Sequence, residues 1–354
     1  MEFSALYQQY QNMTVPSYTL KVGGTELKTG EDAVLLYLDC ELTCRQKAGC
    51  LMVEVSMNPK GENGAKWLKA LQTGVECSLS LGYGKKQTEV FCGFLYEVQW
   101  SDPLAEGALE LSAMFLDVRG RLMTSSCADA GAARTVSQLV KTILDQSCCR
   151  QLAGKQKISQ IPKDWDLPIP RSGYSDYEVL CQAADFLCYE FYVCGGELYF
   201  GEPRPETSPA VTFSGHTGLM KLTAKRTLAG QCAAVVVSGT DDKGDRIMAR
   251  QARAKDSGFG TEKMGSVLSN DVHHPESTVR TMAQAKYLAK AQMEQRQHQS
   301  GGLSGKCLGT PELRPGRFIQ VKKLSQPVNG TYYVHTVRHV LDIDGYSTYF
   351  EAED

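Results

Sequence analysis

The sequence of 354 residues is poor in tryptophan, in unbalanced charge and in long apolar runs. Lys and Arg number 38 against 40 Asp and Glu, and the net charge of -2 provides no basic field for nucleic acid. No apolar run approaches the roughly 18–20 residues that span a bilayer, and no basic and apolar leader opens the chain. These absences predict a cytosolic protein without a stable membrane anchor and without nucleic-acid sequence recognition.

The sequence also lacks the cysteine pattern of a secreted disulfide protein. It holds 13 cysteines, an odd number, and adjacent Cys148 and Cys149 do not fit one ordinary disulfide framework. We interpret the cysteines as reduced and mostly as small core residues. The glycosylation sequons at Asn12 and Asn329 then carry no function, because no secretory route leads to their modification.

Common catalytic and metal-binding motifs are missing as well. No Gly-x-Ser-x-Gly hydrolase motif occurs, and "GYGKK" at 82–86 lacks the spacing of a phosphate-binding loop, so it indicates a hairpin turn. Cys40, Cys44 and Cys50 are not followed by a second Cys or His pair at zinc-finger spacing, which favours core packing. Cys181 and Cys188, seven residues apart, are expected on one buried helix stripe.

The remaining polar candidates each have a structural interpretation that we favour. We expect His273 and His274 in a loop or at a helix start, the carboxylates near 241–245 in a turn, and His335 and His339 on one face of a strand. Asp164 and Asp166 lie in a Pro-rich link, where sequence assigns them no role. We therefore predict no catalytic, cofactor-binding or metal-binding residue, and no cofactor.

Hydrophobic periodicity predicts strands over most of the chain. From Ser17 to about Gly120, six apolar and alternating segments separated by turns predict a barrel or sandwich. Within it, 63–74 has Trp67, Leu68 and Leu71 at helical spacing and predicts one short helix. Alternating segments return after about residue 209, with a hairpin turn at 238–246.

Between these β regions the period changes to that of helices. Residues 133–149 predict one amphipathic helix of about four turns. Ser175 and Glu178 have capping-box spacing before a second helix, and Gly195-Gly196 predicts a β-hairpin. A further helix near 275–299 is expected to begin close to Pro275. We therefore predict a first β-barrel domain at 1–125, a small α/β module at 126–208, and a second barrel at 209–354 with a helical insertion.

The two β regions share a layout that indicates duplication. A Leu stands three residues before Gly74 and before Gly316. Next, Gly93 corresponds to Gly330, Tyr96 to Tyr332, Gly107 to Gly345 and Phe115 to Phe350, in the same order along three strands. The fold class is therefore a β-rich α+β fold in which two related barrels flank the α/β module. This architecture favours a structural ring component over a catalyst.

Two blocks of the sequence resemble phage late control gene D proteins and VgrG-like baseplate hubs. The first matches their helix-to-hairpin segment at Asp176, Leu180, Ala184, Tyr189, Phe191, Leu198 and Phe200. Cys188 stands where this family often has Gly. The second block, 313–354, is similar to the family's closing segment at Leu313, Pro315, Gly316, Gly330, Tyr332, Val334, Val337 and His339. The resemblance covers most of residues 17–354.

The resemblance implies a homotrimeric baseplate hub of a contractile tail or tail-like injection system. Such a hub, with tube-initiator-like barrels, adapts the hexameric inner tube to a trimeric spike, and contacts other baseplate proteins. VgrG proteins continue into a spike, whereas this sequence stops at Asp354, so we expect a separate spike protein. The hub would be synthesised in the bacterial cytoplasm and assembled into the particle.

Two other functions lack the residues that they would need. A phage-associated cell-wall hydrolase would need a nucleophile, zinc motif or carboxylate signature, and none is recognised. A cell-surface-binding module would need exposed aromatic platforms, yet the chain has three Trp, of which Trp67 and Trp100 lie in core-like patterns. The expectation is therefore a structural protein that is not an enzyme.

Overall fold

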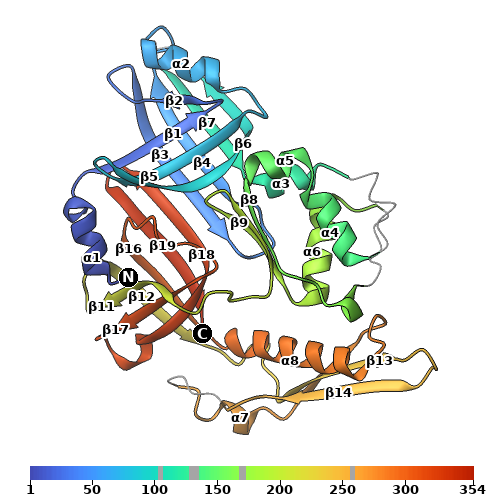
Figure 1. The fold of residues 1–354 in the computed structure, drawn as a ribbon. Helices are drawn as coiled ribbons and strands as arrows, with labels where there is room; N and C mark the ends of the chain where they lie inside the picture. The colour runs from blue at the N-terminus through green and yellow to red at the C-terminus, as the bar shows by residue number, and fades with distance from the viewer. Residues whose placement is uncertain (103–106, 127–134, 167–172, 256–259) are drawn as a thin grey trace.

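The structure is a computed structural model that describes residues 1–102, 107–126, 135–166, 173–255 and 260–354 (Figure 1). Its main element is one large sheet of thirteen described strands, accompanied by two sheets of three strands each. Within these ranges no helix is long and apolar enough to cross a membrane.

The first part of the chain supplies seven strands of the large sheet. They are β1 (Pro16–Val22), β2 (Thr25–Leu27), β3 (Ala33–Thr43), β4 (Cys50–Met57), β5 (Glu76–Tyr83), β6 (Lys86–Ser101) and β7 (Leu109–Leu116). Burial alternates along them, as in β3, where Leu38, Cys40 and Leu42 point into the core. The strands expected in this region are thus present. The short helix expected at 63–74 is α2 (Glu62–Ala70), which buries Trp67.

The last part of the chain supplies the other six strands. They are β11 (Pro209–Ser214), β12 (Leu219–Arg226), β16 (Gly301–Leu308), β17 (Arg317–Lys322), β18 (Gly330–Asp342) and β19 (Gly345–Glu353), with η4 (Gln326–Val328) before β18. The N-terminal segment, α1 (Phe3–Gln9) and η1 (Gln11–Met13), lies against these strands. Phe3 of α1 stacks on Phe213 of β11, with ring centroids 5.3 Å apart. This contact holds the N-terminal helix against a strand that lies about 200 residues later in the sequence.

The α/β module lies beside the first part of the sheet (Figure 1). It contains α3 (Val118–Met123), α4 (Val136–Leu144), α5 (Ser147–Leu152), β8 (Lys155–Ile158), η3 (Lys163–Trp165), α6 (Asp176–Leu187), β9 (Glu190–Cys194) and β10 (Glu197–Gly201). The predicted capping box of Ser175 and Glu178 and the β9–β10 hairpin are confirmed. The single helix predicted over 133–149 is wrong, because Gln146 has an extended conformation and separates α4 from α5.

A third group of elements interrupts the last part of the chain between β12 and β16. It contains β13 (Ala234–Thr240), β14 (Arg246–Ala252), α7 (Met264–Val267), β15 (Asp271–Pro275) and α8 (Met282–His298). Figure 1 shows α8 lying along the sheet of β13 and β14. The predicted helix start at Pro275 is wrong. Pro275 ends β15, and the helix begins after Thr281, which forms a capping box with Gln284.

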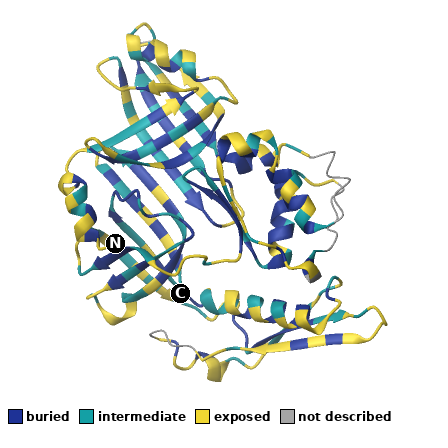
Figure 2. Cartoon of the chain, in the orientation of Figure 1, coloured by how far each residue is buried: buried dark blue, intermediate teal, exposed yellow. Residues whose placement is uncertain are grey.

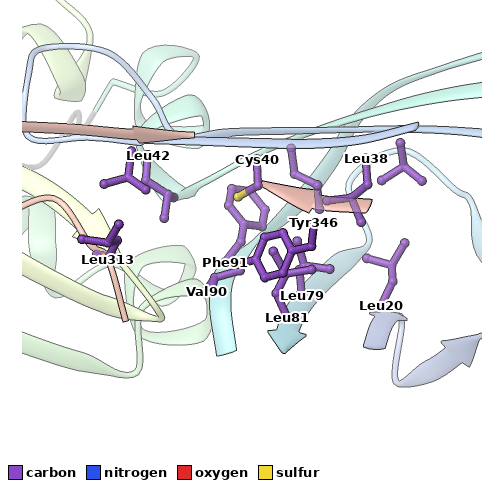
Figure 3. Close-up of a cluster of buried hydrophobic side chains, with 14 of the residues drawn as sticks. Leu20, Leu38, Cys40, Leu42, Leu79, Leu81, Val90, Phe91, Leu313 and Tyr346 are labelled. Atoms are coloured by element: carbon purple, nitrogen blue, oxygen red, sulfur yellow. The ribbon is translucent and has the colours of Figure 1, made fainter. Parts of the chain in front are cut away.

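The core consists of two separate apolar clusters (Figure 2). One cluster packs against the large sheet and contains residues from both its first and its last part. Figure 3 shows Tyr346 from the last part lying among Leu79, Leu81 and Phe91 from the first, and Leu313 belongs to the same cluster. The other cluster joins the α/β module to β13, β14 and α8.

The two barrels predicted from the sequence are not observed as closed barrels among the described strands. β18 pairs with β3, so hydrogen bonding passes directly from the last part of the chain into the first. Among the described strands, pairing closes neither part into a complete barrel. The β-rich α+β class is observed, whereas the division at residues 125 and 208 stays a prediction.

Candidate assembly surfaces

The cysteines weighed as metal ligands belong to the packing of the large sheet. Cys40 is buried within β3, Cys44 is buried just after it, and Cys50 begins β4. Burial raises the pKa of the Cys40 and Cys44 thiols well above the usual value and that of Cys50 to about 11. A protonated thiol is a poor metal ligand. No cluster of three His, Cys, Asp or Glu side chains suited to a metal ion occurs in the described ranges.

The two helix cysteines differ in their surroundings. Cys181 is buried in α6, whereas Cys188 is the C-cap residue of that helix and has a left-handed conformation with φ of 55°. Burial raises the pKa of the Cys188 thiol to about 11. A left-handed C-cap favours glycine, which adopts this conformation without steric cost. Both cysteines therefore serve the helix and its packing.

His273 and His274 lie in β15, which runs parallel to β13, and not in the predicted loop or helix start. The His274 ring lies 3.3 Å from a guanidinium nitrogen of Arg296 on α8. Burial, and secondarily the Arg296 charge, lowers the pKa of His274. A strand is possible here because Val236 and Val237 of β13 provide backbone partners, which sequence spacing does not reveal.

His335 and His339 both lie in β18, but they do not share one face as predicted. A β-bulge between Val334 and Thr336 includes His335 and breaks the alternation. His339 is fully buried, with its Nδ1 atom 3.0 Å from the Tyr346 hydroxyl. Burial lowers the pKa of His339 to about 3 and that of His335 to about 4, so both rings are neutral near pH 7.

The turn candidates have the structural roles that the sequence favoured. One Asp241 carboxylate oxygen accepts hydrogen bonds from the backbone N–H groups of Lys243 and Asp245, at 2.9 and 2.8 Å. These bonds close the β13–β14 turn, which also contains Asp242. The "GYGKK" stretch forms the β5–β6 hairpin, with Gly84 in a left-handed conformation.

The Pro-rich link holds one carboxylate with a clear partner. Asp166 accepts a hydrogen bond of 2.8 Å from the backbone N–H of Ser137, in the first turn of α4. This hydrogen bond gives a partner to one of the free N–H groups at the start of the helix, and it places a negative charge beside the positive end of the helix dipole. The Asp164 side chain lies outside the described part of the chain. Asp166 therefore has a helix-capping role in place of the undefined role left by the sequence.

Several apolar side chains near the ends of β6 and β12 are exposed. Trp100 was expected in a core-like pattern, but it is 51% exposed near the end of β6, whereas Trp67 and Trp165 are buried. Tyr96, also on β6, is 46% exposed, and Leu228, just after β12, is 50% exposed. Such exposed apolar residues are typical of contact surfaces.

The order of strands repeats within the large sheet. The first part has the order β3-β4-β7-β6-β5-β1, and the last part has β12-β16-β19-β18-β17-β11. The final pair differs in direction, because β1 is antiparallel to β5 and β11 is parallel to β17. The repeated order agrees with the repeat seen in the sequence.

Two pairs of β-bulges fix how the repeats superimpose. Leu36 of β3 and Met220 of β12 are bulged residues in the first pair, and Tyr96 of β6 and His335 of β18 are bulged in the second. Aligning either pair places the intervening strands in the same register. The β4–β7 partners Leu51 and Phe115 then coincide with Leu303 and Ala352 of β16 and β19. Two independent features thus give one alignment.

This alignment corrects part of the repeat read from sequence. Gly74 and Gly316 do correspond, since each donates a backbone hydrogen bond to the equivalent strand residue, Leu95 or Val334. Gly93, however, corresponds to Tyr332 and not to Gly330, and Tyr96 corresponds to His335 and not to Tyr332. Phe115 likewise corresponds to Ala352, also two residues from its expected partner. A shift of two keeps every side chain on its face, so sequence pattern alone does not detect it.

The junction of the two repeats is an antiparallel strand pair with a polar outer face. Residues 336–341 of β18 pair with 38–43 of β3. Arg338 donates to both carboxylate oxygens of Asp39, at 2.8 and 2.9 Å, and to the Tyr37 hydroxyl at 2.9 Å. The Cys44 backbone N–H donates to the His335 carbonyl at 2.9 Å. The junction is therefore a continuous sheet that is reinforced by charge.

Comparison with solved structures identifies the architecture. A tail protein from Neisseria meningitidis MC58 superimposes with a TM-score of 0.72 at 15% identity, covering 96% of this chain and 97% of that protein. The chain has the fold of phage tail proteins. The 43 kDa tail protein of prophage MuSo2 from Shewanella oneidensis gives a TM-score of 0.68 at 14% identity, over 96% and 100% of the two chains.

The same tail-protein fold extends to secretion systems. The E. coli c3393 protein, a type VI secretion component described as similar to the T4 tail proteins gp27 and gp5, gives a TM-score of 0.57 at 12% identity. That match covers 94% of this chain and 76% of the E. coli protein. No model of a known protein family matches the sequence, and no curated protein matches it. The similarity is thus one of fold.

Proposed function

We propose that this protein is the structural baseplate hub of a contractile tail or phage-tail-like particle. Three copies form a ring that adapts a hexameric inner tube to a trimeric spike. The observation that carries this proposal is the repeated strand order within one continuous sheet, joined at β18 and β3. The similarity to phage tail proteins over nearly the whole chain supports the same role.

The repeat gives a physical reason for such an adapter. A ring of three chains with two similar parts each presents six similar units, while its true symmetry is three-fold. A six-fold partner can then contact both parts of every chain in nearly the same way. A three-fold partner can contact features that occur once per chain. In this proposal, each of the two similar parts of the chain is one of the tube-initiator-like barrels predicted from the sequence.

The distribution of additions suggests which end meets which partner. The α/β module follows the C-terminal end of β7, and the β13–α8 group follows that of β12; both additions therefore leave the sheet at the same end. This end carries the larger additions, and we assign it to the spike. The opposite end carries the β18–β19 turn, where Ile343 is 95% exposed. We assign that end to the six-fold tube.

The proposed role is structural and non-enzymatic. The hub would be made in the bacterial cytoplasm and incorporated into the particle, with tube, spike and other baseplate proteins as partners. The tail proteins with the same fold support this assignment. Neither a cell-wall hydrolase nor a cell-surface-binding module receives support from a specific arrangement of the described side chains.

The test combines mass measurement with genetic complementation. The purified chain should form a particle of three 38.9 kDa copies, and a strain lacking the gene should release no assembled tails. Ile343→Asp should keep the trimer but abolish tube attachment, as seen by electron microscopy. The control Val267→Asp alters an exposed residue of α7, within the additions, and should retain the tube. Normal tails in the deletion strain would contradict the hub assignment.

A further inference from the structure

Strand β18 and its counterpart β6 differ in how many strands pair with their edges. One edge of β18 pairs with β19. The other edge pairs first with β17, through 330–334, and then with β3, through 336–341. From Tyr333 to Leu341, β18 therefore has partners along both edges except at the bulged His335.

β6 has the same arrangement except for one missing partner. One edge pairs with β7, and residues 86–94 of the other edge pair with β5. Beyond Leu95, no described strand pairs with the second edge, so Glu97–Ser101 are unpartnered along it. At one end of the large sheet, β12 pairs with β16 and with no other described strand. Among the described strands, the open edge of β12 and the open part of β6 correspond to the two strands of the internal junction.

We propose that β6 of one copy pairs with β12 of a second copy, in the register of the internal β18–β3 junction. The inference rests on the proposed hub, because it supplies the contact that closes the ring. The bulges align β18 with β6, and β3 with β12. At the position of the internal pair Arg338–Glu41, the contact between copies would therefore pair Gln99 with Lys225. His339–Cys40 becomes Trp100–Ala224, and Val340–Asp39 becomes Ser101–Thr223.

The exposed apolar residues meet at this contact. Within the chain, the Cys44 N–H donates a hydrogen bond to the His335 carbonyl. The corresponding bond between copies would run from the Leu228 N–H of one copy to the Tyr96 carbonyl of the other. These two side chains are each about half-exposed in the single chain, as is Trp100. Pairing brings Tyr96 beside Leu228 and sets Trp100 opposite the small Ala224. Three apolar side chains thereby leave water at one contact.

The charges along the two edges are complementary as well. β6 carries Glu97 on the same face as Gln99, whereas β12 carries Lys221 and Lys225. In the proposed register Glu97 lies diagonal to Lys225, within reach of a long side chain. The internal junction also has a diagonal charge contact, between Arg338 and Asp39, although it lies at a different position along the strands. Backbone pairing, apolar burial and charge thus favour the same occupant, a second copy of this chain.

Engineered cysteine pairs test this register directly. We would combine Gln99→Cys with Lys225→Cys, and separately Ser101→Cys with Thr223→Cys, and oxidise the purified full chain. Each pair should give covalent oligomers that stop at three copies and disappear on reduction. Directly opposed residues come close enough for a disulfide. The wild type and the single variants, which retain the native thiols, define the background.

A shifted pair provides the matched control. Gln99→Cys with Lys221→Cys places the second thiol four residues along β12, about 13 Å from the proposed partner. It should not cross-link above background. Trimers that form without cross-linking by the matched pairs, or equal cross-linking by the shifted pair, would overturn the proposed register and leave the hub intact. A ladder that stops at another number would keep the pairing and contradict the three-fold hub.

Fluorescence gives a readout without engineered thiols. Trp67 and Trp165 are buried in the single chain, so assembly should shift the emission of Trp100 alone towards the blue. Trp100→Phe should assemble without that shift. A red, concentration-independent Trp100 emission in solutions that contain trimers would contradict burial at the contact. A chain that stays monomeric throughout contradicts both proposals.

Discussion

Arg119 and Asp117 form an ion pair that is removed from water at the start of the α/β module. The guanidinium donates to Asp117 at 2.8 and 3.0 Å, and to the carbonyls of Thr43 and Arg45 after β3. Asp117→Ala should lower the free energy of unfolding by about 3–5 kcal/mol, because it leaves a buried charge unpaired. Denaturant titration measures this change. Glu62→Ala, which breaks an exposed helix pair with Lys66, should change stability little.

Glu190 links stability to pH at the contact of β9 with β18. Its carboxylate accepts a hydrogen bond from the Tyr333 hydroxyl. Burial raises the pKa of Glu190 from 4.5 to about 7, although nearby Arg45 and Arg204 oppose the shift. The protonated form is therefore favoured in the folded state. The stabilising effect is complete below pH 4.5 and is lost as pH rises through about 7.

Glu190→Gln should remove this pH dependence. The wild type should lose roughly 3 kcal/mol from this group between the two pKa values, in addition to changes shared with the variant. Denaturant unfolding from pH 4 to pH 8 measures the difference between the two profiles. Parallel profiles would show that Glu190 is ionised in the folded protein throughout that range.

The end of helix α6 shows how one element tolerates an unfavourable residue. Cys188 has a left-handed conformation that glycine adopts without steric cost. Cys188→Val should be less stable than Cys188→Gly by about 1–2 kcal/mol, because a β-branched side chain is strained there. Thermal unfolding of both variants, with Cys188→Ala as the size control, measures the effect. Equal stability of all three would place the cost elsewhere.

At the scale of the whole molecule, the shared core couples the two repeats. Leu38 of β3 and Leu313 before β17 are fully buried in the same cluster. Leu38→Ala and Leu313→Ala should each destabilise the protein by about 2–5 kcal/mol. Hydrogen exchange should show that either change reduces protection in peptides from both repeats. Protection that falls in one repeat alone would mean that the repeats unfold separately.

Sequence pattern was sufficient for several elements because their signals are local. Alternation predicted the strands, Ser175 and Glu178 predicted a helix start, and Gly195-Gly196 predicted a hairpin. Where a local signal competed with a longer-range partner, prediction failed. Pro275 suggested a helix, but pairing of β15 with β13 decided for a strand. Trp100 likewise follows the pattern of a core residue but lies at an unpaired edge.

The sequence by itself determined the β-rich class, the start of helix α6 and the presence of a repeat, since burial periodicity and turn chemistry depend on neighbouring residues. Only the tertiary structure decided the register of that repeat, because a shift of two residues preserves every pattern. It also decided that β18 joins β3 and that β6 and β12 keep free edges. Strand partners far apart in sequence are chosen by the packing of the whole chain, and no local segment contains that information.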